Sequence, residues 1–318
     1  MADVLIVSLG STAGLRAADA ELADSLRRSG ASVELVRARP PRPVRTLMLT
    51  DMRWAQSARS VTEPALRALN PKSVLYSSTT ASLFGPRTGA IRFDAPSAAN
   101  RPGRHGLWQR PLERRRLARA PLLLPWSEAG LRETGLDGAP AVVLPVPVES
   151  SGPAGERDIA AITYAANPAK KGLARILAAW REARRPGEEL VVAGAPASGE
   201  GVRAVGLLAP DEYRALLRRA RVFVSAPRRE DYGVAQLEAL ADGCRLVSAP
   251  APGPYVALPI ARALDPRLVG EDLAGALRLA LDAPEDGYAD RARVALEDFS
   301  RRAIDQTVRD RVLPVLLR

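Results

Sequence analysis

The sequence predicts an α/β protein with two domains, each a parallel sheet covered by helices. Residues 221–250 read as strand, loop, helix and strand, which is one step of a parallel sheet. Residues 4–36 repeat this order near the start of the chain, and the polar stretch Ser150–Glu156, with two glycines, reads as a linker between the two regions. With 318 residues, each half can bury a core of its own, so we predict two Rossmann-like domains.

The clearest α/β step lies in the second half. Val222–Ser225 is a short apolar run rich in β-branched residues, which predicts a buried strand. Arg228–Gly233 is polar and ends in glycine, so it reads as a loop. Ala235–Ala241 contains good helix formers and stops before a glycine, and Leu246–Ser248 opens the next strand. In parallel sheets, ligands bind where such a loop lies, at the carboxyl ends of the strands.

The first half begins with a second step of this kind. We expect a strand at Val4–Ser8, a helix at Ala17–Arg28 and a strand at Val33–Val36. The intervening loop, Gly10–Gly14, lacks the Gly-x-Gly-x-x-Gly pattern and so gives little support for NAD binding. The remaining elements expected in residues 1–150 are a short strand or turn at Leu47–Met52, helices at Val61–Leu69, Leu112–Ala118 and Glu128–Thr134, the last capped by Ser127, and strands at Val74–Tyr76, Ala90–Phe93, Pro121–Pro125 and Val142–Val148.

The second domain is expected to span residues 156–299, followed by a last amphipathic helix at residues 300–318. Hydrophobic periodicity and capping signals indicate its other elements. These are strands at Ile159–Tyr164, Leu190–Ala193 and Val202–Leu207, and helices at Leu173–Arg184, Pro210–Ala220, Leu273–Leu281 and Ala289–Phe299.

Composition excludes several classes of protein. Cys244 is the only cysteine, so no intramolecular disulfide can form, and with a single histidine there is no His/Cys metal cluster. No apolar run approaches the roughly 20 residues that cross a bilayer, and the first residues read as a strand rather than a signal peptide. We therefore expect a cytoplasmic protein without a metal or bound cofactor.

The net charge is +10 and is uneven along the chain. Residues 1–155 hold 21 basic and 13 acidic side chains, a difference of +8, whereas the remainder holds 25 and 23, a difference of +2. A basic first half favours an anionic partner, but a general preference for arginine over lysine would produce the same total. Nucleic acid is not expected, because no recognition motif is present and aromatic residues make up only 4% of the chain.

Two carboxylates mark the loop and helix after the second-half strand. Glu230 falls in the loop just after the strand, and Glu238 follows eight residues later in the first turn or so of the helix. Gly233 lets the backbone approach a ligand, and the free N–H groups of a helix start hold an anion. This arrangement suits a nucleotide-sugar, because the carboxylates can accept hydrogen bonds from sugar hydroxyls and the backbone amides can bind the diphosphate. Because glutamates eight residues apart are common, the spacing alone favours the alternative, in which Glu230 is a solvated loop charge and Glu238 a residue favoured by the helix dipole.

The full string Glu-Asp-Tyr-Gly-Val-Ala-Gln-Leu-Glu-Ala-Leu-Ala-Asp-Gly, residues 230–243, resembles the Glu-x7-Glu signature of family 4 retaining glycosyltransferases, which have the GT-B fold. This resemblance implies two Rossmann-like domains facing a cleft, with the last helix crossing back to the first domain. It implies that Glu230 contacts the donor sugar ring and Glu238 the ribose hydroxyls. The backbone of Gly233 and Val234 would meet the donor diphosphate.

The segment before the second domain's first helix also matches in part. The resembling enzymes clamp the diphosphate with an Arg and with the Lys of a Lys-Gly pair, which corresponds here to Lys171 and Gly172. The Arg position falls near Ala166, so half of the clamp is missing. Lys170, Asn167 or an arginine of the first domain could compensate.

In the first domain, the resemblance gives further expected site residues. Gly10, Ser11 and Gly14 would face the donor and acceptor, although a plain strand-to-helix turn fits them as well. Where family members often have a sugar-contacting histidine, this chain has Asp94, and its only histidine, His105, lies eleven residues on. A surface histidine is the alternative for His105.

A cluster of arginines runs through Arg101–Arg119, with Trp108 and Leu107 inside it and Glu113 as the single acid. An aromatic residue among arginines is typical of a peripheral contact with the inner membrane face or of a site for an anionic or lipid-linked acceptor. A solvated helix is the alternative.

Together these features predict a metal-independent glycosyltransferase that moves a sugar from a nucleotide-diphosphate sugar with retention of configuration. No Asp-x-Asp pair occurs that could bridge a metal to a diphosphate. The alternative is a catalytically impaired GT-B-like protein that binds a nucleotide or a partner, which the missing clamp arginine favours.

Overall fold

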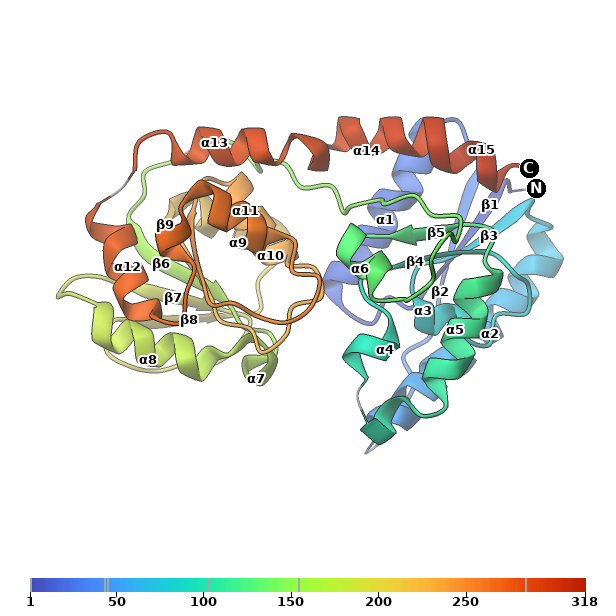
Figure 1. The fold of residues 1–318 in the computed structure, drawn as a ribbon, viewed down its shortest axis with the longest axis horizontal. Coiled ribbons are helices and arrows are strands. Elements are labelled where there is room, and N and C mark those ends of the chain that lie inside the picture. The colour runs from blue at the N-terminus through green and yellow to red at the C-terminus, as the bar shows by residue number, and fades with distance from the viewer. Residues whose placement is uncertain (1, 43, 45, 102, 154, 284) are drawn as a thin grey trace. The chain divides into compact units, whose positions relative to one another are not determined.

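The chain folds into two compact units. The structure, a computed structural model, describes residues 2–42, 44, 46–101, 103–153, 155–283 and 285–318 (Figure 1). Unit 1 comprises residues 1–147 together with 301–318, and unit 2 comprises residues 148–300. Two residues of the stretches singled out above, Pro102 in the arginine cluster and Ala154 in the linker-like segment, lie outside the described residues.

Unit 1 contains a five-stranded parallel sheet with the strand order β2-β1-β3-β4-β5. The strands are β1 (Val4–Ser8), β2 (Val33–Arg37), β3 (Ser73–Tyr76), β4 (Ala90–Phe93) and β5 (Leu123–Pro125). These bounds confirm the strands predicted at the corresponding positions. Each strand is buried or nearly so, apart from the edge strand β2, as expected for a sheet covered on both faces.

Both faces of this sheet carry a hydrophobic core. On β1, alternate side chains point to opposite faces, so Val4 and Ile6 belong to one cluster and Leu5 and Val7 to the other. The first cluster includes α1 (Ala13–Arg28) and the end of the chain. The second includes residues of α2 (Leu47–Leu69) and α5 (Gln109–Arg119).

The last residues of the chain belong to unit 1. A single helix was predicted, but the structure has α14 (Arg301–Thr307), a wide π-helical turn at Val308–Val312 and α15 (Leu313–Leu316). Pro314 has no N–H to continue the regular hydrogen-bond ladder, which explains why the helix widens just before it. Ile304, Val308 and Val312 are buried in the first cluster.

One prediction in unit 1 was wrong at the start of α2. Leu47–Met52, predicted as a short strand or turn, is the beginning of a 23-residue helix that continues through Pro64. The Thr46 hydroxyl caps the helix by accepting a hydrogen bond from the Leu49 N–H. Arg101 then pairs with the buried carboxylate of Asp51 at 2.7 Å, a contact that sequence periodicity cannot reveal.

The prediction of a strand at Val142–Val148 was also wrong. The segment is extended, and the N–H groups of Val142 and Leu144 donate to the carbonyls of Leu123 and Pro125 at 3.0 and 2.8 Å. Since Pro145 and Pro147 carry no N–H, the pairing cannot continue as a regular ladder.

Unit 2 contains a second five-stranded parallel sheet, with the order β10-β9-β6-β7-β8. Its strands are β6 (Ile159–Tyr164), β7 (Leu190–Ala193), β8 (Val202–Gly206), β9 (Ala220–Ser225) and β10 (Arg245–Ser248). All five were predicted, β8 as one residue longer. The neighbouring position of β9 and β10 brings the loops after them together at one edge of the sheet.

Helices cover both faces of this second sheet. Figure 1 shows α8 (Leu173–Ala183) and α12 (Leu273–Asp282) on one side of it, and α9 (Pro210–Arg219) and α10 (Val234–Ala241) on the other. The helix predicted at Ala289–Phe299 is α13 (Tyr288–Ala295) followed by a 3-10 turn at Glu297–Phe299, and α11 (Ala257–Leu264) was not predicted.

Both units also contain short helices. In unit 1 these are α3 (Thr79–Ser82), α4 (Ser97–Asn100), α6 (Glu128–Arg132) and the 3-10 turn Gly103–Gly106, and in unit 2 they are α7 (Pro168–Lys171) and the 3-10 turn Pro266–Leu268.

Candidate functional site

The candidate site lies at the carboxyl edge of the sheet in unit 2, where three loops meet. The loop after β9 is central, because its backbone bonds to both neighbours. The Arg228 N–H donates to the Lys170 carbonyl of the loop after β6 at 2.9 Å. The Glu230 N–H donates to the Pro252 carbonyl of the loop after β10 at 3.1 Å. Backbone bonds therefore hold the three loops in one arrangement.

Two glycines make this close approach possible. Gly172 has φ +66° and Gly253 has φ +104°, conformations that other L residues rarely adopt. A Cβ atom on Gly172 would collide with the Ala226 carbonyl oxygen, and one on Gly253 with the Glu230 carbonyl oxygen. The glycine of the Lys-Gly pair is thus required by packing against the end of β9.

The structure brings Lys171 and Glu230 into contact. The Lys171 Nζ lies 2.5 Å from the Glu230 carboxylate, and the Gln236 amide donates to the same carboxylate oxygen at 3.2 Å. The Glu230 side chain is buried, whereas the Lys171 side chain keeps 21% of its surface exposed. A cation at the rim of a buried carboxylate can therefore be reached by a ligand from solvent.

The start of α10 supplies an anion-binding element beside this pair. Gly233 occupies the N-cap position with φ +95° and has no side chain to accept from the first N–H groups of the helix. Such amides, together with the helix dipole, favour a negatively charged ligand. Val234 is the first residue of this helix, so the structure places both backbone positions that the sequence singled out at its amino end.

Glu238 lies one turn into the same helix and is half-buried. Burial raises the pKa of its carboxyl group, the Arg214 guanidinium 3.7 Å away acts in the opposite direction, and Asp242 reinforces the increase. Arg214 is held in place by a second carboxylate, because its Nε donates to Asp242 at 2.6 Å. The pKa of Glu238 is raised because burial removes water from its carboxylate and Arg214 compensates for that loss only in part.

The neighbouring lysine has a different partner. Lys170 pairs with Asp231 at 3.1 Å, and Arg229 pairs with the same carboxylate at 2.7 Å. Asn167 accepts the Lys170 N–H at 3.0 Å and so acts as the N-cap of α7. Two residues predicted to compensate for the missing clamp arginine thus already have structural partners.

Arg228 is a cation that sequence reasoning missed. Its side chain is exposed, and within the part of the chain that the structure describes it makes no side-chain hydrogen bond or ion pair. Its backbone bond to Lys170 fixes it next to the two lysines. By contrast Ala166, where the resembling enzymes carry the clamp arginine, is an exposed alanine packed near Gly194.

Gln236 and Tyr255 were also missed. Gln236 bridges Glu230 and the Ser225 hydroxyl, the latter at 2.8 Å. The Tyr255 hydroxyl bonds to Ser225 and Ser248 at 3.2 and 2.9 Å, which links the ends of β9 and β10. Gln236 stood inside the string that carried the resemblance, but nothing in the sequence indicated which way its side chain points.

The site residues predicted in the first half lie in unit 1. Asp94 follows β4 and is half-buried, with a carboxylate oxygen accepting the Ala95 N–H at 2.8 Å. His105 is exposed in the 3-10 turn Gly103–Gly106. Gly10 has φ +57° and its carbonyl accepts from Arg16 at 2.9 Å, and both Ser11 and Gly14 are exposed at the start of α1.

Unit 1 also has a buried polar network at the ends of its strands. The Asp19 carboxylate accepts from the hydroxyls of Ser8 and Ser77, the latter at 2.9 Å, and lies 3.9 Å from the Arg92 guanidinium. Burial raises the pKa of Asp19, and the hydroxyls and Arg92 oppose the increase. Arg92 also stacks over Trp126, 4.9 Å from the ring centroid. This network connects α1 to β4 and to the residues at the ends of β1 and β3.

The described residues contain neither a metal-binding cluster nor a helix that could span a membrane. Their His, Cys, Asp and Glu side chains form no group of three or more that could hold a metal ion. Among the helices described, none is both long enough and apolar enough to span a bilayer.

Comparison with known proteins places the fold. No protein-family model matches the sequence, and no curated protein sequence matches it. Solved structures do match over almost the whole chain. WaaG, a glycosyltransferase involved in lipopolysaccharide biosynthesis, is 12% identical with a TM-score of 0.71, over 97% of this chain and 99% of that one.

Two more structures agree. Sucrose-phosphate synthase from Thermosynechococcus elongatus is 14% identical with a TM-score of 0.66, over 96% of each chain. Anabaena HepE, solved in complex with UDP and glucose, is 14% identical with a TM-score of 0.65, over 97% of this chain and 98% of that one. The chain has the GT-B fold of these glycosyltransferases, which confirms the predicted fold class.

Proposed function

We propose that the protein is a glycosyltransferase that transfers a sugar from a nucleotide-diphosphate sugar, with the donor bound on unit 2. The observation that carries this proposal is the contact between Lys171 and the buried Glu230 carboxylate beside the uncapped start of α10. A cation and free amides next to a buried acceptor suit a ligand that is anionic at one end and rich in hydroxyls at the other. The fold shared with glycosyltransferases supports the same class.

Each group has a role in this mechanism. The diphosphate accepts hydrogen bonds from the amides of Gly233 and Val234 and from the Lys171 ammonium. Glu230 accepts from hydroxyls of the sugar ring, and Glu238 from the ribose hydroxyls. As the bond to the sugar breaks, negative charge grows on the leaving diphosphate, and the fixed positive groups lower the barrier by stabilising it. This charge stabilisation requires no protein nucleophile and fits transfer with retention of configuration.

Arg228 supplies the second cation of the clamp in this proposal. The position that carries arginine in the resembling enzymes is Ala166, and Lys170 is already paired with Asp231. Arg228 is exposed and is held beside the lysines by its backbone bond. A guanidinium there can bind the diphosphate through two parallel hydrogen bonds.

The remaining features of the reaction are proposed from chemistry alone. With cations and amides available, diphosphate binding does not need a metal ion.

The acceptor is proposed to be an anionic or lipid-linked molecule on unit 1, where Asp94 follows a strand. Arginines of α5 and the exposed Leu107 would hold the protein at the inner membrane face as a cytoplasmic, peripheral enzyme.

The alternative is a GT-B protein that binds a nucleotide or a partner without transferring a sugar. The alanine at the clamp position supports it. In that case Glu230 would be a structural partner of Lys171 and would have no catalytic role.

Thermal unfolding against nucleotides and nucleotide-sugars, in EDTA, tests the donor site. A ligand at 100 times its dissociation constant stabilises the folded state by about 2.7 kcal/mol, which raises the midpoint of unfolding. We expect this increase with nucleotides of one base, and a larger increase with a nucleotide-sugar that carries one particular sugar. Lys171→Ala should reduce the shift, whereas Arg181→Gln, which removes an exposed charge from α8, should leave it unchanged. If none of the compounds shifts the midpoint, the donor site is refuted.

Hydrolysis or transfer of the identified sugar then separates the two readings. An enzyme should lose roughly 10²-fold in turnover with Lys171→Ala, the usual effect of removing one such donor, and should lose transfer with Glu230→Ala. A binding protein shows the nucleotide shift but no turnover in any variant.

A further inference from the structure

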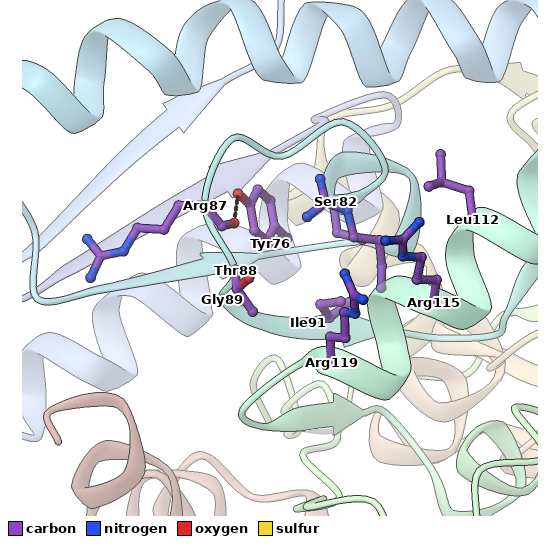
Figure 2. A pocket seen from close by; sticks show the side chains of 10 residues that line it. Tyr76, Ser82, Arg87, Thr88, Gly89, Ile91, Leu112, Arg115 and Arg119 are labelled. Atoms are coloured by element: carbon purple, nitrogen blue, oxygen red, sulfur yellow. Dashed lines mark hydrogen bonds between the residues drawn. The ribbon is translucent and has the colours of Figure 1, made fainter.

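A separate cavity of about 190 Å³ lies in unit 1, between α5 and the loop that joins α3 to β4 (Figure 2). One wall is formed by Arg115, Arg116 and Arg119 of α5, and the other by Arg87 and Thr88 of the loop. The amino end of β4, where this loop enters the sheet, is opposite to the edge at which Asp94 follows the same strand. The cavity is therefore distinct from the loop edge of unit 1.

The charge of this cavity is uncompensated. Its lining includes three arginines of α5 and no carboxylate, and the Arg87 guanidinium points away from it in Figure 2. In the chain as described, none of these four arginines forms an ion pair, although most charged clusters elsewhere are paired, as in Arg278 with Glu188 and Asp282. Three like charges along one wall of a hollow repel each other, and an anion in the hollow reduces that repulsion.

Two of the arginines are fixed by carbonyl groups, which orient them without neutralising them. Arg116 donates to the carbonyls of Leu83, at 3.1 Å, and Gly85. Arg87 donates to the carbonyls of Pro71 and Lys72, at 2.7 and 2.6 Å. The walls of the cavity are thus built before any ligand arrives.

The loop itself is also held rigidly. The buried Tyr76 hydroxyl donates to the Arg87 carbonyl at 2.7 Å, as Figure 2 shows. Cβ atoms on Gly85 and Gly89 would collide with the Tyr76 ring and the Val74 carbonyl, so the loop lies directly against β3. Such preorganisation lowers the entropy lost when a ligand binds.

Arg115 and Arg119 remain available. Both are exposed, and in the described part of the chain their side chains form no hydrogen bond or ion pair. The helix dipole favours cations in the last turn of α5, which accounts for Arg116 and Arg119 on the helix. It does not account for Arg115 or for the lack of any acid in the lining.

We propose that this cavity binds a phosphate group, with Arg115 and Arg119 closing on it and the Thr88 hydroxyl as a further donor. Guanidinium groups match the geometry of phosphate oxygens and form charge-assisted hydrogen bonds with them. The phosphate belongs either to a small phosphorylated molecule or to a lipid headgroup. This site is independent of the donor site in unit 2.

The test compares two double variants with the same loss of charge. Arg115→Gln/Arg119→Gln removes the two available cavity arginines, and Arg309→Gln/Arg311→Gln removes two exposed arginines of unit 1 that do not line the cavity. Calorimetric titration with inorganic phosphate, against chloride at equal ionic strength, measures free phosphate. Co-flotation with phosphatidic acid vesicles, against phosphatidylcholine vesicles, measures headgroup binding.

We expect saturable binding in at least one arm, weakened about tenfold or more by the cavity variant and less than twofold by the control. Binding of inorganic phosphate identifies a small phosphorylated ligand, and binding to phosphatidic acid alone identifies a headgroup. Equal losses in the two double variants would mean general surface charge and would overturn the proposal, as would no binding in either arm. Because the substituted side chains are exposed, circular dichroism should show both variants folded.

Discussion

Removing the Lys171 charge should destabilise unit 2 through its buried partner. Lys171→Met leaves the Glu230 carboxylate, 8% exposed, with the neutral Gln236 amide at 3.2 Å. Breaking a buried ion pair by removing one partner costs about 3–5 kcal/mol. Since Lys171 is one-fifth exposed, we place the loss just below this range, at about 2–3 kcal/mol.

A double-mutant cycle isolates the pair itself. Glu230→Gln alone should cost less, about 1 kcal/mol, because the freed ammonium can turn toward water. With both substitutions the losses should not add, and a coupling of about 1–2 kcal/mol should remain. The free energies of unfolding come from differential scanning calorimetry of the four proteins.

The surface pair of Lys72 and Asp3 provides the control. The Lys72 Nζ lies 2.8 Å from the Asp3 carboxylate, but the lysine side chain is 64% exposed. Lys72→Met should therefore lower the free energy of unfolding by less than about 1 kcal/mol. Additivity of Lys171→Met and Glu230→Gln within about 0.5 kcal/mol would refute the idea that this pair is coupled in the folded protein.

Three further outcomes are expected. Gly172→Ala should destabilise the protein by several kcal/mol in urea titrations and weaken nucleotide binding, because it adds a backbone collision to left-handed strain, whereas Gly187→Ala, at φ +83° in open space, should cost only about 1–2 kcal/mol. Burial raises the pKa of Glu238 above 4.5, so the folded state holds that proton more tightly and stability falls as pH rises from 4.5 through the folded pKa; Glu238→Gln should remove this slope, and an unchanged slope would contradict the assignment. Val312→Ala should lower the stability of unit 1 by about 2 kcal/mol, whereas the exposed Val294→Ala should change stability by less than about 0.5 kcal/mol in the same calorimetric assay.

Most of the fold could be predicted from local sequence, because the strands of both sheets are short β-branched runs and the helices are amphipathic. Two predictions failed. Leu47–Met52, predicted as a short strand or turn, is the start of the helix α2, because its local propensity is weak and tertiary partners decide between the alternatives. Pro145 and Pro147 prevented the strand that the apolar pattern of Val142–Val148 favoured.

The candidate site was accessible from sequence only where residues are close along the chain. Glu230, Gly233 and Glu238 share one loop and helix, so their spacing could be read directly. The contact between Lys171 and Glu230 joins residues 59 positions apart and depends on the order of β6 and β9 in the sheet. Likewise Arg228 drew no attention in a chain rich in arginine, because its distinction is the lack of a partner in the described residues.

The arginine cluster was interpreted as one patch, but the structure divides it. Arg101 is paired with Asp51, and Trp108 packs against Phe84 with ring centroids 5.8 Å apart. Arg115 and Arg119 line a cavity with a residue of a distant loop, Arg87. A linear charge count could not separate these roles, because they depend on which distant segments the fold brings beside each arginine.

The composition of unit 1 from both ends of the chain has a consequence for its biosynthesis. All strands of its sheet are translated before unit 2, but Val308 and Val312, which are fully buried in its core, are translated after it. While the ribosome completes unit 2, α1 covers part of this face, and the part that the last residues cover stays exposed to water. Unit 2, whose residues are contiguous, can close first, so the amino-terminal domain would be the last to mature.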